Sequence, residues 1–476
     1  TASTASASSS LSTTRAASSS STPIVVAAPA STTTTAATAI VLPAADGKKR
    51  VQPVVPLRVS VPSAEQPPTV RLLPSLIPSK ELVLSSLGTS TECEQQRNGS
   101  VGGSAAATPS PTDAAVSAIL PGDPSSWSAL ERLRLSGGAV HPSNWSLFIT
   151  HLSSFTSLHD LSLYRCEGLT DTVLHTLLPK CPHLTSLQLA RLRVRKPMIH
   201  SSHLCVLKLL ECEDLTSPHI ACETLHTLVL TGSEKLIAPY IQAGKLTTLD
   251  LTGCQQLTNP TLYCPLLSTL DLSTCTALSP ESIQTQLEHC PKLTSLRLNG
   301  CRSLTTLSLT SNSLTTLHAC WCTHLTLLSL ECIKLRSLYA YGCAKLNTTA
   351  IKGRHQLTNL ELQKCASIDD SLLANLTLTT KGSHLELLNL TDCQTLRAPR
   401  INCTRLRVLH LYNCLQLKSL ILYCPALDML NLTHCVDVTS VSLATPKLST
   451  LLCAGCKRLP DEQIRAVLQS CPALRT

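Results

Sequence analysis

The chain has 476 residues, of which 43% are hydrophobic and only 14% are charged, and its formal net charge is +9. This modest charge does not by itself indicate nucleic acid as a partner, and we expect none. No run of about 18 apolar residues occurs, so we expect neither a transmembrane helix nor a membrane partner. The length alone suggests two or three domains, unless internal repeats replace separate cores.

Residues 1–123 differ in composition from the rest of the chain. They are rich in Ser, Thr, Ala and Pro, as in the opening TASTASASSSLSTTRAASSSSTP. This composition buries too little apolar surface to offset chain entropy, so we predict a disordered tail. The segment RLLPSLIPSKELVLSSLG (71–88) is richer in Leu and could form a short helix after Pro78. We interpret it as an apolar cluster in a linker, with a docking segment or the remnant of an upstream module as the alternative.

Residues 124–476 are periodic and form the second predicted domain. An L-x-x-L-x-L unit begins fifteen times, at intervals of 20–22 or 26–28 residues, with Ala or Cys in place of the last Leu in three copies. The units begin at Leu130, Leu158, Leu184, Leu204, Leu225, Leu246, Leu267, Leu293, Leu314, Leu335, Leu357, Leu385, Leu406, Leu427 and Leu448. This pattern and period are the signature of leucine-rich repeats. The sequence therefore predicts an α/β solenoid with a parallel β-sheet on its concave face.

The second half of each unit varies, which predicts different structures on the back of the solenoid. Some short units repeat L-x-x-L-x-L, as at Leu304, Leu307 and Leu309, and should add a second short strand. Long units hold helical patterns such as LSPESIQTQLEHCPKL (278–293), with Ser279 as the N-cap. In other units a proline stands in this half, and because proline lacks a ladder donor we expect extended but irregular backbone. These residues are Pro218, Pro239, Pro260 and Pro399.

The 24 cysteines follow the repeat. Twelve lie eight residues after the leading Leu: Cys166, Cys212, Cys254, Cys275, Cys301, Cys322, Cys343, Cys365, Cys393, Cys414, Cys435 and Cys456. Eight lie three residues before it: Cys181, Cys222, Cys264, Cys290, Cys332, Cys403, Cys424 and Cys471. Both places are corners where the chain turns inward, so we predict buried thiols rather than disulfides or zinc ligands. Free thiols imply a reducing compartment, and we expect a cytoplasmic or nuclear protein.

The cysteines at both corners, as in LTTLDLTGCQQLTNPTLYCPLLSTL, make residues 127–476 resemble the cysteine-containing leucine-rich repeats of F-box proteins. The 21-residue units are most similar to the plant F-box/LRR-repeat protein 15 type. The resemblance implies a substrate receptor of a Skp–cullin–F-box ubiquitin ligase, whose repeats hold a protein substrate or adaptor while the F-box binds the Skp subunit. The residues before the repeats depart from the family, because no stretch there matches an F-box.

The solvent positions of the predicted concave strands are mostly Thr, Ser, Asn or Asp. Larger and charged side chains gather in the units that begin between residues 293 and 357, and again in the unit at Leu406. Because Tyr, Trp and Arg are the usual anchors of protein interfaces, we predict that this group binds the protein partner. Its members are Arg297, His318, Trp321, Tyr339, Tyr341, Glu361, Lys364, His410 and Tyr412.

Catalysis has little support in the sequence. His318 and Cys320 lie in the same strand, but no third residue orients the histidine and no oxyanion hole is evident. We identify no catalytic, cofactor or metal site, and we predict a protein that is not an enzyme.

Two other interpretations stay open. An extracellular adhesion or receptor ectodomain would fit the Ser/Thr-rich start of the chain and sequons such as those at Asn144, Asn347 and Asn375. Nucleic-acid binding would fit the basic run of Arg191, Arg193, Arg195 and Lys196, which we interpret instead as a solvated coil edge.

Overall fold

The computed structural model describes residues 57–61, 80–86, 128–137, 140, 142–351, 356–378 and 384–475. All of them belong to one unit of the chain, Val54–Thr476. The prediction of disorder over residues 1–123 therefore falls outside the described residues, except at two short segments. Within the described ranges, no helix is both long enough and apolar enough to cross a membrane.

A parallel sheet of seventeen described strands runs through this unit, and one strand is paired with the next along the whole stack. All fifteen predicted units contribute a strand to it, which confirms the predicted α/β solenoid. The strands are β1 (Leu57–Val61), β2 (Glu81–Ser86), β3 (Arg132–Ser136), β4 (Asp160–Tyr164), β5 (Ser186–Ala190), β7 (Val206–Leu210), β9 (Thr227–Val229), β11 (Thr248–Asp250), β13 (Thr269–Asp271), β14 (Ser295–Arg297), β16 (Thr316–His318), β18 (Ser337–Tyr339), β20 (Asn359–Glu361), β21 (Leu387–Asn389), β23 (Val408–His410), β25 (Met429–Asn431) and β27 (Thr450–Leu452).

The register of the long sheet follows the leucines. Counting the leading Leu as position 1, the position-4 leucines of neighbouring coils lie opposite each other, as Leu249 lies opposite Leu270. Both side chains are fully buried, as are those at position 6 such as Leu251. Because alternate side chains of a strand point to opposite faces, positions 3 and 5 face solvent on the concave side. The leucine core therefore lies between the two walls of the stack.

Strands β1 and β2 correct the sequence interpretation of residues 71–88, which had suggested a helix or a linker cluster. Glu81–Ser86 is a strand, and Leu82 lies opposite Leu133 in β3. Buried Leu82 fits an inward position of a repeat whose leading residue is not Leu, which is why a search for a strict L-x-x-L-x-L missed it. The repeat stack consequently begins before residue 124.

The back wall carries three shorter parallel sheets. Their strands are β6 (Met198–His200), β8 (His219–Ala221), β10 (Tyr240–Gln242) and β12 (Thr261–Tyr263); β15 (Thr306–Ser311), β17 (Leu327–Cys332) and β19 (Thr348–Ile351); and β22 (Arg400–Asn402), β24 (Ser419–Tyr423) and β26 (Ser440–Ala444). The second and third sheets include the second strands predicted from the doubled leucine pattern.

The prediction of irregular backbone at the back-wall prolines was wrong. Pro218 immediately precedes β8, and strands also follow Pro239, Pro260 and Pro399 directly. The reason is that the prolines stand just before the strands, where only their carbonyls are used. The N–H of Tyr240 donates to the Pro218 carbonyl oxygen at 3.0 Å. Proline thus lacks a donor at a place where the ladder requires only an acceptor.

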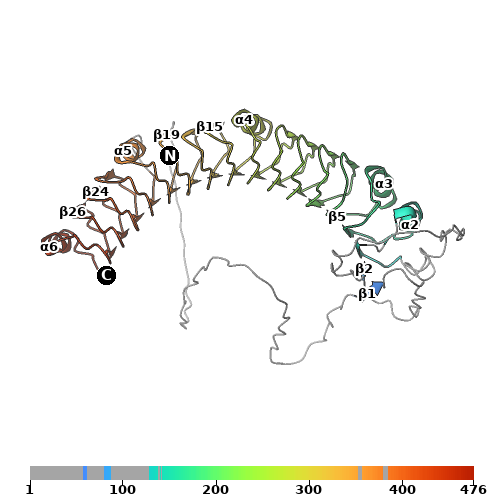
Figure 1. Ribbon diagram of the computed structural model, residues 1–476, viewed down its shortest axis with the longest axis horizontal. Helices are drawn as coiled ribbons and strands as arrows, with labels where there is room; N and C mark the ends of the chain where they lie inside the picture. The colour runs from blue at the N-terminus through green and yellow to red at the C-terminus, as the bar shows by residue number, and fades with distance from the viewer. Residues whose placement is uncertain are drawn as a thin grey trace, which may run out of the picture. The chain divides into compact units, whose positions relative to one another are not determined.

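Helices occupy the back of the long units, as predicted, and Figure 1 shows them along the side opposite the long sheet. They are α2 (Trp145–Leu152), α3 (Asp171–Leu177), α4 (Pro280–His289), α5 (Asp370–Leu378) and α6 (Asp461–Ser470), with short 3-10 turns at Pro142–Asn144 and Leu178–Lys180. The predicted N-cap of α4 is confirmed, because the Ser279 hydroxyl accepts a bond from the Ser282 N–H at 3.1 Å. Ile283 and Leu287 of α4 are buried.

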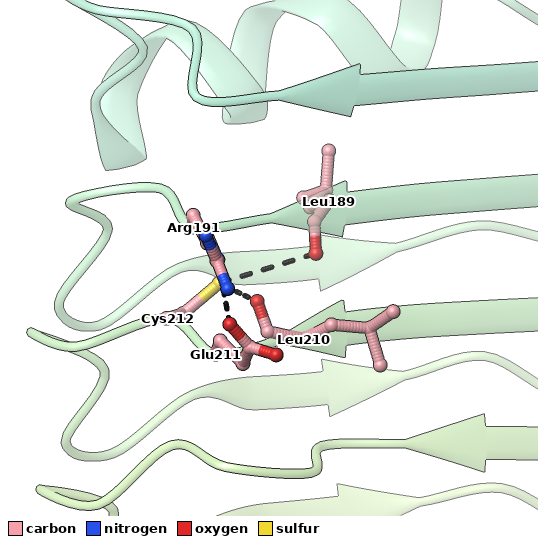
Figure 2. Close-up of polar contacts among 5 residues, drawn as sticks. All are labelled: Leu189, Arg191, Leu210, Glu211 and Cys212. Atoms are coloured by element: carbon pink, nitrogen blue, oxygen red, sulfur yellow. Dashed lines mark hydrogen bonds and ion pairs between the residues drawn. The ribbon is translucent and has the colours of Figure 1, made fainter. Parts of the chain in front are cut away.

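The first-corner cysteines complete the contact between successive coils. Each of the twelve thiols donates to the position-6 carbonyl of the preceding coil, with Sγ–O distances of 2.9–4.0 Å. Figure 2 shows one case, in which the Cys212 thiol faces the Leu189 carbonyl. All of the described cysteines are free thiols, and those at the two corners are buried except Cys456, which is partly buried. The predicted burial at the corners is thereby confirmed.

Serine does not form the hydrogen bond that cysteine forms at this corner. Ser233 occupies position 9 of the coil that begins at Leu225, and it is fully buried. Its hydroxyl has no hydrogen-bond partner. A C–O bond is shorter than a C–S bond, so the hydroxyl does not reach the carbonyl that a thiol would approach. The structure therefore explains the preference for cysteine through reach as well as through apolar character.

Exchanging these two residue types should change stability in opposite directions. Ser233→Cys should raise the free energy of unfolding by about 1 kcal/mol, because a thiol can replace the unpaired hydroxyl. Cys254→Ser should lower it by about 1–3 kcal/mol, because it buries a second unpaired hydroxyl. Urea denaturation in reducing buffer measures both values. A Ser233→Cys protein that is no more stable than the wild type would contradict this account.

Alkaline pH should unfold the stack. Burial raises the pKa of Cys254 and Cys264 to about 12 and that of Cys222 and Cys290 to about 11, from an ordinary value of 9.0. Because the folded pKa exceeds the unfolded one, the stabilisation is complete below pH 9.0 and is lost as pH rises toward 11 or 12. Each such thiol should remove up to about 1.4 kcal/mol per pH unit in this window.

The melting temperature, followed above and below the thiol pKa in reducing buffer, tests this expectation. Lysine and tyrosine also titrate at alkaline pH, so a variant with Ala at the same four positions is the control. It should be less stable near neutral pH, but its melting temperature should fall less steeply with rising pH. Equal slopes for the two proteins would exclude the thiols as the cause.

Candidate functional site

Position 8 of the repeat, at the carboxyl end of each long-sheet strand, has an unusual backbone. All fifteen predicted units have a positive φ there. Glycine occupies the position in six of them, at residues 137, 232, 253, 300, 342 and 455. The other nine carry side chains, and they are Arg165, Arg191, Glu211, Thr274, Trp321, Lys364, Asp392, Asn413 and His434.

The left-handed conformation at position 8 follows from how the coils pair. It lets the position-8 N–H donate to the position-7 carbonyl of the next coil, as Gly232 does to Thr252 at 2.8 Å. Glycine adopts this conformation freely, whereas other residues incur about 1–2 kcal/mol of backbone strain. A bulky side chain at position 8 is therefore present despite backbone strain, and Trp321 is the largest such side chain.

Among the described residues, Trp321 and His434 are the two with an aromatic ring and a positive φ. The φ of Trp321 is 59°, and 47% of its surface is exposed. Its ring lies over Gly342, where an added Cβ would come within 2.5 Å of the indole. The ring meets Tyr341 edge to face, with centroids 5.7 Å apart. The Lys364 ammonium lies 5.9 Å from the indole centroid. The next coil thus provides Gly342 and Tyr341, and the coil after it provides Lys364, so the indole is held at the surface by two successive coils.

The neighbouring column holds a second ring pair. His318 and Tyr339 stack almost in parallel, with ring centroids 4.4 Å apart and planes 7° apart. Beside them, the Arg297 guanidinium lies 3.7 Å from a carboxylate oxygen of Asp271. Four aromatic residues therefore form one continuous surface over two adjacent coils, and we call this surface the aromatic patch. It consists of His318, Trp321, Tyr339 and Tyr341.

Glu361 lies opposite Tyr339 in the pairing of β18 with β20, whereas His410 and Tyr412 lie farther along the same face. The Glu361 carboxylate accepts a bond from the Gln363 amide at 2.6 Å. Tyr412 meets His434 edge to face at 5.6 Å, which makes a second, smaller aromatic cluster. The coil of β21, with Asn389 at position 5, separates this cluster from β20. The structure therefore brings Arg297, Lys364 and the aromatic patch together and leaves His410 and Tyr412 apart from them.

Position 5 has a structural use in other coils. The side-chain oxygens of Asp250, Asp271, Asn389 and Asn431 each accept a bond from the backbone N–H two residues ahead, at 2.9–3.1 Å. In the aromatic patch, His318 and Tyr339 occupy position 5, and their rings stack on each other. Their side chains are therefore not committed to closing their own coil.

Burial shifts the pKa values of two histidines and one cysteine in this region. Burial, followed by the nearby Arg297 charge, lowers the pKa of His318 below its ordinary value, and burial also lowers the pKa of His410. Burial raises the pKa of the Cys320 thiol to about 11. Cys320 is 1% exposed, and its thiol faces the Tyr339 carbonyl at 3.5 Å. Within the residues that the structure describes, no group of three or more potential metal ligands converges.

Sequence reasoning missed two features of these walls. His434 belongs to the second cluster, and its position-8 register was the signal that could have identified it. On the back wall, five rings form a continuous row with neighbouring centroids 4.5–6.0 Å apart. They are His200, His219, Tyr240, Tyr263 and His289. The available signal was that the first four stand one or three residues after a proline, while His289 is the last residue of α4.

Comparison with known proteins assigns no family to the chain. No family model and no curated protein matches it. The chain is similar to one in a crystal structure of a Rad7–Elc1 complex in yeast, with 18% identity, a TM-score of 0.22, and coverage of 44% of this chain and 64% of that one. It is also similar to a chain in a TLR13–ssRNA13 complex, with 12% identity, a TM-score of 0.16, and coverage of 64% and 72%. These likenesses are too weak to transfer a partner or an activity to this chain.

Proposed function

We propose that this protein is a non-catalytic recognition scaffold that binds a protein partner through the aromatic patch on its concave wall. The main support for this proposal is the backbone conformation, exposure and packing of Trp321. Its indole stands at a backbone position that favours glycine, is half exposed, and rests on Gly342. A large exposed aromatic ring held rigidly on a strand-lined wall has the properties of an interface anchor.

The surroundings of the patch support binding rather than chemistry. Its rings are rigid and presented side by side, so little side-chain entropy is lost when a partner covers them. The Cys320 thiol next to the patch is buried and protonated at neutral pH. We propose on these grounds that the protein is not an enzyme.

The thiols support a reducing compartment, and we propose the cytoplasm or nucleus. Twelve of them act as protonated donors between coils, a role that oxidation would abolish. This use of cysteine favours the intracellular interpretation over an extracellular ectodomain. Asn144, in one of the sequons that had suggested glycosylation, is only 8% exposed.

Within this function we propose the role of substrate receptor in a Skp–cullin–F-box ubiquitin ligase, or of a related adaptor. The support is the resemblance of the repeats, with cysteine at both corners, to those of F-box proteins. The described part of the chain supplies the recognition wall of such a receptor. Skp and cullin subunits are then the second class of partner.

Removing the aromatic patch should abolish partner capture without unfolding the protein. Trp321→Gly places the favoured residue at a left-handed position and should change the free energy of unfolding by no more than about 1 kcal/mol. Combined with Tyr339→Ala, it should weaken partner binding about tenfold or more. Quantitative affinity capture from cell extracts, with a thermal melt of each protein, measures both effects.

A matched control is Tyr263→Ala with Tyr423→Ala. These tyrosines are 51% and 65% exposed on back-wall strands, so this control also removes two exposed aromatic residues. Capture should be unchanged by it. If both double variants lost the same proteins, or if neither lost any, the aromatic patch would not be the binding site.

The ligase role predicts a separate set of captured proteins. Skp and cullin subunits should be captured equally by the wild type and by the Trp321→Gly, Tyr339→Ala variant, because the patch would hold only the substrate. Reciprocal capture with tagged Skp and cullin should recover this chain. Failure of both captures would refute the ligase role while leaving protein recognition by the patch in place.

A further inference from the structure

A second feature of the concave edge lies near the amino-terminal end of the described repeats. A hollow of about 480 Å³ opens at the corner where the coils of β4 and β5 turn. Three arginines, Arg165, Arg191 and Arg193, line it together with Glu167. The hollow is thus dominated by guanidinium groups, in a chain with few charges for its length.

The guanidinium groups are held near one another by an aromatic ring. The Arg165 and Arg191 guanidinium carbons lie 5.4 and 5.8 Å from the Tyr164 ring centroid. Figure 2 shows Arg191 directed toward Glu211, with 2.6 Å between its Nε and a carboxylate oxygen. Neither Arg165 nor Arg193 has an ion pair with any carboxylate among the described residues. Two of the three guanidinium groups therefore have no direct carboxylate partner, although Glu167 lines the same hollow and the Arg193 charge helps to lower the pKa of Asp214.

The backbone around the hollow is fixed. Arg165 and Arg191 occupy position 8 with φ of 50° and 54°, so their strained backbones set the direction of both side chains. The loop that carries Arg193 is held by Asp171 of α3, whose carboxylate accepts the backbone N–H groups of residues 195 and 196 at 3.0 and 2.9 Å. A binding site whose donors are pre-oriented loses less entropy when it binds a ligand.

We infer that this hollow binds a phosphate monoester, specifically the phosphoryl group of a phosphorylated serine or threonine on a partner protein. Such a group carries nearly two negative charges and three strong acceptor oxygens, which match several guanidinium forks. Arg165 and Arg193 would supply the first pairs, and Arg191 could exchange Glu211 for the phosphate. The three guanidinium groups outnumber the carboxylates of Glu167 and Glu211, so a dianion gains more attraction here than a monoanion does.

This inference does not rest on the proposed function, because the hollow shares no residue with the aromatic patch. It does lie in the same position-8 row, so one extended partner could contact both. Since the two sites are separate, their tests can fail independently. In particular, Trp321→Gly should leave phosphate binding unchanged.

The test uses the full chain and N-acetyl-O-phosphoserine amide as the probe, titrated at low salt and followed by ³¹P NMR. The binding variant is Arg165→Gly with Arg193→Gln, and glycine at position 165 suits the left-handed backbone there. Arg302→Gln with Arg336→Gln removes the same charge from other exposed sites and is the matched control. The binding variant should bind the probe about tenfold or more weakly than the wild type, and the control should match the wild type.

Three results would overturn the inference: no binding of the probe by the wild type, equal weakening in both double variants, or tighter binding of dimethyl phosphate than of phosphoserine. The second would indicate a general effect of net charge, and the third would indicate preference for a phosphodiester, as in nucleic acid. A thermal melt of each variant should coincide with that of the wild type, which shows that lost binding is not unfolding.

Discussion

The hydrogen bond from a corner thiol to the carbonyl of the preceding coil is the contact on which the regularity of this stack depends. Position 6 of each strand ends the inward leucine row, and after it the chain turns through a left-handed residue. The position-6 carbonyl accepts the position-9 N–H of its own coil, as Leu251 does from Cys254 at 3.3 Å, and the thiol of the next coil adds a second bond to it that joins the two coils. Ser233, which is buried without a partner, shows what the stack loses without sulfur. The cysteines are thus structural donors, and their chemistry is suppressed by burial.

The same turn provides the positions from which side chains can contact a partner. The left-handed residue at position 8 is required by the pairing of the coils, and glycine satisfies it at least strain. Wherever another residue stands there, its side chain projects from a fixed backbone at the edge of the concave wall. Trp321 forms part of the aromatic patch in this way, and Arg165 and Arg191 line the basic hollow. Both proposed sites therefore use side chains at position 8, whose left-handed backbone the repeat requires.

The two proposed sites differ in their charge. The patch is built from four rings, with Arg297 beside Asp271 at one side and the Lys364 ammonium against the Trp321 ring, and burial lowers the pKa of its histidine, His318. Such a surface gains affinity from apolar contact and shape. The hollow keeps two guanidinium groups without carboxylate partners, and it gains affinity from charge-assisted hydrogen bonds. A partner could satisfy both with one extended segment, because both lie at the same edge of the long sheet.

The sequence by itself determined the solenoid, because leucines two residues apart can only share one face of a strand, and a fixed period forces the strands into register. It also placed the thiols at the corners, and it named the aromatic residues by their position in the repeat. It did not reveal β2, whose repeat lacks a leading leucine, nor the regular strands that follow the prolines, because hydrogen bonds between coils decide these. Only the tertiary structure laid Trp321 over Gly342, joined His434 to Tyr412, and gathered Arg165, Arg191 and Arg193 around one hollow. The physical reason is that each of these contacts joins residues of different coils, and the period fixes which coils are neighbours but not how their side chains meet.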